Sequence, residues 1–160
     1  MKTVMGLRIT SVLLALASLP AHAEDARFVL SFGAQAGAPL PHSYSYGKLP
    51  QAAATLSMRV PVVDAKLRGV LADTELTVDT ASNLVTRVHA ERAYTSLNDC
   101  TAGRDVLKAK LAELMPTPLA AEERGWQFQA ADGKSVAGAV CRLERYLPYP
   151  VLVFDMSAAP

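Results

Sequence analysis

Alternation of apolar and polar side chains predicts most of the strands of this chain. Residues 27–32 alternate, which predicts a strand packed on one side. A second strand is predicted over 56–62, where Pro61 cannot donate to a strand ladder and so indicates a sheet edge or a strand end. A weaker strand is predicted at 68–71, whereas 34–54 is rich in Gly, Pro, Ala, Ser and Tyr and is typical of a long loop.

Two hairpins follow from the same alternation. The first joins strands at 75–79 and 84–94, and the second joins strands at 126–130 and 139–143 across a tight Asp-Gly turn. A last strand is predicted at 151–156. One face of the first hairpin's second strand is apolar and the other is polar, which is typical of an antiparallel sheet with one solvated face. The apolar face is expected to carry Leu84, Thr86, Val88, Ala90 and Tyr94, and the polar face Arg87, His89 and Glu91.

Between residues 98 and 115 the hydrophobic residues recur with the spacing of a helix. Asn98 or Asp99 can cap this helix and Pro116 can stop it. One helix among consecutive strands joined by short connections predicts an α+β domain with a largely antiparallel sheet, on which the helix packs. The stripe that faces the sheet comprises Cys100, Gly103, Leu107, Leu111 and Leu114.

The first 23 residues predict a cleavable signal peptide. Two basic residues precede the apolar run 9–19, and the small-x-small ending Ala21-His22-Ala23 stands before acidic Glu24. The alternative, a membrane anchor, needs about 20 uninterrupted apolar residues, and this run is broken by polar residues and a proline. We therefore expect one domain over 24–160, without a transmembrane segment and located in a bacterial periplasm.

Charge and cysteine content refine this picture. The full chain has a net charge of +1, and loss of the two basic residues of the signal peptide brings it to −1. Without a basic run, the sequence favours neither nucleic acid nor an anionic membrane surface as a partner. Cys100 and Cys141 are expected to face inward and to pair in an oxidising compartment. Such a disulfide would staple the helix onto the sheet.

The residues typical of catalysis form no specific motif. After signal cleavage the chain keeps only His42 and His89 as histidines. His89 and Glu91 are two apart on a predicted strand, so a carboxylate can orient an imidazole there, or both can belong to a solvated charged face. We expect no cofactor and no metal site. A hydrolase with its site around His89 and Glu91 is one function that the sequence leaves open.

The segment 39–50 has the most unusual composition. Tyr44 and Tyr46 alternate with small polar residues next to His42, a composition that is favoured in recognition loops. Alternatively, the tyrosines pack down beneath a short edge strand. A second aromatic cluster at 146–150 contains two prolines and is interpreted as a structural bend.

The sequence therefore predicts an exported module that binds another protein of the periplasm or envelope through His42, Tyr44 and Tyr46. An inhibitor or immunity-type role is one form of this function, and the sequence favours binding over enzymatic activity without excluding the latter. The alternative is a protein that binds a small ligand or an envelope component on the face of the sheet.

Overall fold

The computed structural model describes residues 21–44, 53–115, 117–119, 126–129, 133, 135–143 and 146–158. Within these residues, seven strands form one sheet in the order β1-β2-β3-β7-β6-β5-β4, and every neighbouring pair is antiparallel. The expected α+β class is confirmed. The strands are β1 (Thr55–Pro61), β2 (Asp73–Asp79), β3 (Leu84–Ala93), β4 (Thr117–Leu119), β5 (Trp126–Gln129), β6 (Ser135–Leu143) and β7 (Pro150–Ala158).

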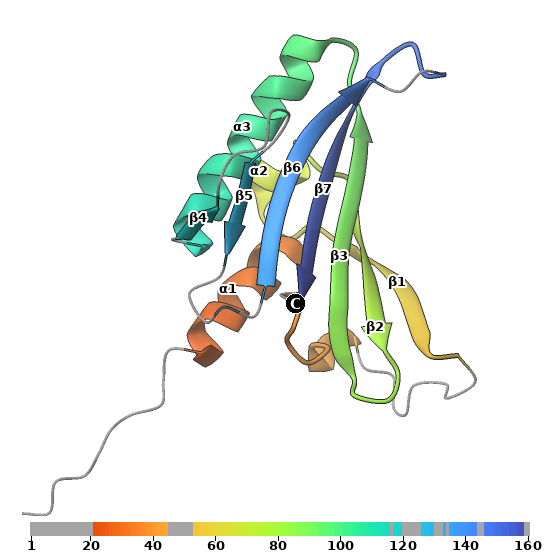
Figure 1. Ribbon diagram of the computed structural model, residues 1–160, viewed down its shortest axis with the longest axis vertical. Coiled ribbons are helices and arrows are strands. Elements are labelled where there is room, and N and C mark those ends of the chain that lie inside the picture. Colours follow the sequence, from red (N-terminus) through yellow and green to blue (C-terminus); the bar gives the residue numbers. More distant parts are fainter. Residues whose placement is uncertain are drawn as a thin grey trace, which may run out of the picture.

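Helices cover one face of this sheet (Figure 1). The main helix α3 (Leu97–Leu114) packs on β6 and β7, and α1 (Ala21–Phe32) contacts α3. The short helix α2 (Ala65–Arg68) follows β1, and the 3-10 turn η1 (His42–Tyr44) lies between α1 and β1. The core lies between the sheet and α1 and α3.

Helix α3 confirms the predicted stripe, because Cys100, Gly103, Leu107, Leu111 and Leu114 are its buried residues. Its N-cap is Ser96 rather than Asn98 or Asp99, and the Ser96 hydroxyl accepts a hydrogen bond from the backbone N–H of Asp99. The helix ends at Leu114, and the predicted stop Pro116 lies outside the described residues.

The prediction of a strand at 27–32 is wrong, since these residues belong to α1. Phe28 and Phe32 are four residues apart, so on a helix both face the core, where the Phe32 ring stacks on Phe154 with 4.8 Å between the ring centroids. Leu30 points away from this face and is exposed. The helix ends at Phe32 and is followed by Gly33, whose φ of 90° falls in the left-handed region that favours glycine.

The weaker strand predicted at 68–71 is also wrong. The Asp64 carboxylate caps α2 by accepting hydrogen bonds from the N–H groups of Lys66 and Leu67, so the chain turns helically there. The first part of the predicted loop is ordered as well, since Gly37 and Leu40 make backbone hydrogen bonds to residues 83–85 at the start of β3. Strand β4 was not expected, because no element is predicted between the helix at 98–115 and the strand at 126–130.

The hairpin of β2 and β3 forms as predicted, but a register shift between Thr77 and Val78 changes its faces. Thr77 pairs with Arg87 and Val78 with Val85, so Thr86 is an extra residue on β3. In consequence Val85 is buried and Leu84 is partly exposed, the reverse of the simple alternation. The extra residue Thr86 forms a β-bulge. After it the predicted alternation holds, because Val88 and Ala90 are buried.

Candidate functional sites

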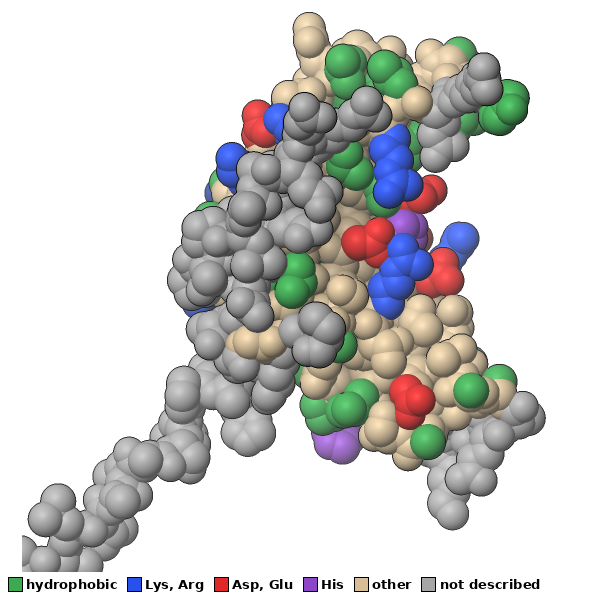
Figure 2. Space-filling model, in the orientation of Figure 1, with side chains coloured by type: hydrophobic (Ala, Val, Ile, Leu, Met, Phe, Trp, Pro, Cys, Tyr) green, Lys and Arg blue, Asp and Glu red, His purple; other side chains and the backbone are tan. Residues whose placement is uncertain are grey.

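A row of charged side chains occupies the solvated face of the sheet. The sheet register places His89 of β3 between Glu75 of β2 and Asp155 of β7. Arg87 and Glu91 extend from β3 on the same face. Figure 2 shows charged side chains and a histidine gathered there. We call Arg87, His89, Glu91 and Asp155 the charged row.

Short contacts connect the whole charged row. The Asp155 carboxylate oxygen Oδ1 lies 2.6 Å from Arg87 Nε and 3.1 Å from His89 Nδ1, and His89 Nε2 lies 3.3 Å from Glu91 Oε1. The hydrogen bond to Asp155 raises the pKa of the Arg87 guanidinium, and the nearby carboxylates of Glu75 and Glu91 act in the same direction. The predicted common face of His89 and Glu91 is therefore present.

The charged row is better suited to holding strands together than to catalysis. A general base needs one imidazole nitrogen directed at the substrate, but a carboxylate lies beside each nitrogen of His89. Exposed ion pairs of this kind contribute about 0.2–1 kcal/mol each. Among the described residues, no group of His, Cys, Asp and Glu side chains is arranged to hold a metal ion.

A depression of about 240 Å³ lies beside the charged row and opens to solvent. Thr74 belongs to its lining, but the Thr74 hydroxyl points into the core and donates hydrogen bonds to the carbonyls of Phe32 and Val60, at 2.9 and 3.3 Å. This hydroxyl is therefore not presented to a ligand. The lining is mainly polar and comprises Arg59, Ala72, Asp73, Thr74, Glu75, His89, Ala90 and Glu91.

The sequence-predicted binding residues do not form one exposed surface within the described part of the chain. His42 is exposed at the start of η1, whereas the half-buried Tyr44 packs against the hydrophobic core. Tyr46 lies outside the described residues. Tyr44 is therefore packed, as in the alternative that places the tyrosines beneath a short edge strand. It lies, however, on a 3-10 turn and not on a strand.

Apolar side chains are exposed at the end of the sheet where β6, β7 and α3 meet. Tyr146 is 90 % exposed and Leu143 69 % exposed, and Leu97 and Tyr149 are exposed to a lesser degree. Leu143 pairs with Pro150 in the register of β6 and β7. Figure 2 shows hydrophobic side chains at this end of the molecule. We call Leu97, Leu143, Tyr146 and Tyr149 the apolar end.

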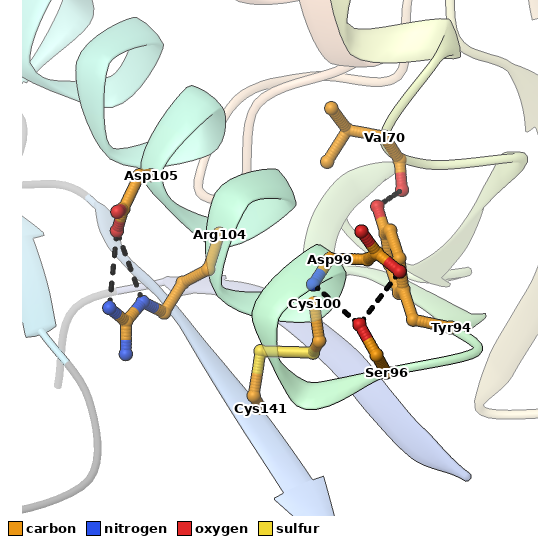
Figure 3. Close-up of a disulfide and its surroundings, with 8 residues drawn as sticks. All are labelled: Val70, Tyr94, Ser96, Asp99, Cys100, Arg104, Asp105 and Cys141. Atoms are coloured by element: carbon orange, nitrogen blue, oxygen red, sulfur yellow. Dashed lines mark hydrogen bonds and ion pairs between the residues drawn. A yellow bond between two sulfur atoms is a disulfide. The ribbon is translucent and has the colours of Figure 1, made fainter.

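A disulfide joins α3 to β6 close in sequence to two residues of the apolar end (Figure 3). Cys100 in the first turn of α3 is bonded to Cys141 of β6, with 6.1 Å between their Cα atoms, as the sequence predicted. Cys141 is two residues before Leu143, and Cys100 is three residues after Leu97. The bond therefore joins the segments that carry Leu97 and Leu143.

Tyr94 anchors the same region to the rest of the fold. Its backbone N–H donates to the carbonyl of Pro150, and its hydroxyl donates to the carbonyl of Val70, each at 2.9 Å. Burial raises the pKa of the Tyr94 phenol. Gly103 of α3 leaves room for this ring, since a Cβ at residue 103 would collide with the phenol oxygen.

The chain was compared with known protein families, curated proteins and solved structures, and none of them matches. No helix among the described residues is long and apolar enough to cross a membrane.

Proposed function

We propose that this protein is an exported module that binds another protein through the apolar end. The observation that carries the proposal is the exposure of Tyr146, an aromatic side chain that is 90 % accessible and follows the exposed Leu143 by three residues. Tyrosine offers a large contact area and a hydroxyl at low entropic cost, and it is enriched among the residues that dominate interface energies.

Rigidity supports the same surface. Preorganised side chains lose less entropy when they bind, and the Cys100–Cys141 bond restrains the two segments from which Leu97 and Leu143 project. Tyr44, by contrast, packs against the core, and less of it is left to contact a partner. The apolar end is thus a better contact surface than the segment around His42.

Export is supported by the disulfide, because such bonds persist in oxidising compartments such as the bacterial periplasm. Cleavage after Ala23 would shorten α1 by its first residues and keep Phe28 and Phe32, which the core requires. The intact mass of the exported protein should correspond to a chain that begins at Glu24. A mass that includes residues 1–23 would contradict this part of the proposal.

Site-specific photo-cross-linking tests the contact surface. A photoreactive phenylalanine analogue at residue 146 should capture one defined protein from a periplasmic extract. The matched control places the analogue at Leu84, which is also partly exposed but lies at the opposite end of β3. Equal capture from both positions, or none from residue 146, would contradict the proposal.

Affinity for the captured protein then provides the second measurement. Tyr146→Ser should weaken binding by about tenfold or more, as expected of an interface residue that costs at least 1.4 kcal/mol on truncation. Its free energy of unfolding should stay within about 0.5 kcal/mol of the parent value, because the side chain is exposed. Unchanged affinity would remove the apolar end from the interface.

A further inference from the structure

Strand β1 is an open edge of the sheet. It pairs only with β2 among the described residues and stands at the margin of the fold in Figure 1. The opposite edge, β4, has three residues, whereas β1 has seven. A long edge strand presents a row of backbone donors and acceptors to any strand that approaches it.

The register identifies which backbone groups face outward. Thr80 donates its N–H to the carbonyl of Ala54, and the pairs that follow run from Thr55 with Asp79 to Pro61 with Asp73. In an antiparallel pair, alternate residues direct both backbone groups at the partner strand. Leu56, Met58 and Val60 therefore face β2, and Thr55, Ser57 and Arg59 turn their N–H and C=O groups outward, together with the carbonyl of Pro61.

Within the described residues, these outward groups make no backbone hydrogen bond beyond the strand ladder. The side chains of β1 are incompletely covered as well. Val60 is buried, but Leu56 and Met58 on the same face of the strand are only partly buried. Among the described residues, the outward backbone groups of this edge thus have no backbone partner, and two of its apolar side chains are only partly covered.

The residue pattern of β1 is complementary to itself. If two copies pair antiparallel about Met58, all seven residues overlap. Met58 then lies opposite Met58, and Leu56 opposite Val60, so each apolar side chain meets an apolar one. Ser57 lies opposite Arg59 of the other copy, and their outward backbone groups form the hydrogen-bonded pairs.

No like charges lie directly opposite in this register, and the two Arg59 side chains are diagonal neighbours on one face. Each Arg59 has Glu75 as its neighbour on β2 and would have an uncharged Ser57 on the other side. The register therefore avoids the directly opposite like charges that destabilise a strand pair. Pro61 ends the overlap, where its missing N–H costs least.

We propose that β1 joins two copies of this chain into a symmetric dimer with one continuous sheet. The dimer uses none of the residues of the apolar end, so it is independent of the proposed function. It leaves the apolar end of each copy free.

The first test measures self-association and backbone protection together. Analytical ultracentrifugation of the purified protein should show a monomer–dimer equilibrium. Amide exchange, followed by NMR over the same concentration range, should slow at Thr55, Ser57 and Arg59 as the dimer forms. The amides of Leu56, Met58 and Val60 should be protected at every concentration, because they already face β2. A monomer at millimolar concentration, or a dimer without this alternating change, overturns the proposal.

Substitution of Ser57 of β1 by charged residues provides the second test. Ser57→Lys places a cation opposite Arg59 of the other copy and should weaken the dimer, whereas Ser57→Glu should strengthen it. Each change should lie between about 2-fold and about 30-fold in the dissociation constant, since cross-strand charge pairs contribute modestly and the dimer contains each pair twice.

The matched control is Thr77→Lys, which adds the same charge at the residue that pairs with Ser57 on β2, away from the open edge. It should leave the dissociation constant unchanged. Effects of the same sign for Ser57→Lys and Ser57→Glu, or an equal effect of Thr77→Lys, would show that β1 is not the interface.

Discussion

Reduction of the Cys100–Cys141 disulfide should destabilise the protein by about 4 kcal/mol. The two cysteines are 41 residues apart in the chain, and the chain-entropy relation for a closed loop of this length gives this magnitude. For a domain of this size, each kcal/mol lowers the melting temperature by roughly 3–4 °C. We therefore expect a loss of about 12–16 °C.

Urea denaturation of the oxidised and the reduced wild-type protein is the cleanest measurement, because no side chain is replaced. Cys100→Ser should behave like the reduced protein, with a further cost because Cys100 is fully buried and the new hydroxyl needs a partner. Adding Cys141→Ser should change little, since the bond is already lost and Cys141 is only partly buried.

Two results would contradict the expected loss of stability. One is a difference below about 1 kcal/mol between the oxidised and reduced proteins, which would mean that the loop contributes far less entropy than the relation requires. The other is titration of two free thiols in the unfolded, unreduced protein, which would mean that the bond does not form.

Two further predictions concern backbone conformation and pH. Gly33→Ala should destabilise the protein by about 2–4 kcal/mol, because the residue has a positive φ and its new Cβ would lie 2.6 Å from Val60 Cγ2. Gly69→Ala, at a negative φ and without such a clash, is the control for thermal melts and should stay within about 0.5 kcal/mol of the parent. The hydrogen bond from Lys110 lowers the pKa of the Asp64 carboxyl below 3.8. The stabilisation of the folded state by this ion pair is therefore full above about pH 4, and it is lost as the pH falls through the lowered pKa of Asp64. Asp64→Asn keeps a capping side chain but loses the charge, so it should be less stable than the parent by about 0.5–1 kcal/mol at pH 7. This difference should vanish in acid. Urea melts that show the same difference at pH 7 and in acid would contradict a role for the ion pair of Asp64 with Lys110.

Long periodic segments were predictable from the sequence because many positions report the same geometry. Every residue of the predicted stripe in α3 is buried, and this stripe and the alternation in β6 together placed Cys100 and Cys141 for bonding. The short segment around Phe28 and Phe32 was ambiguous. A spacing of four satisfies both a strand and a helix, and only packing against Phe154 decides between them.

The charged row shows a different limit. His89 and Glu91 were placed on one face from their spacing, but Asp155 is 66 residues away from His89 in the chain. Its position depends on the pairing of β3 with β7, which no local pattern reports. The apolar end was missed because prolines near Tyr146 indicated a bend and gave no measure of exposure.

The position of β7 has a consequence for how the protein is made. This strand follows all the others in the chain, yet it lies in the middle of the sheet between β3 and β6. The sheet therefore remains in two separate parts until residues 150–158 have been synthesised, and the half that contains β6 cannot join the meander of β1, β2 and β3 before then.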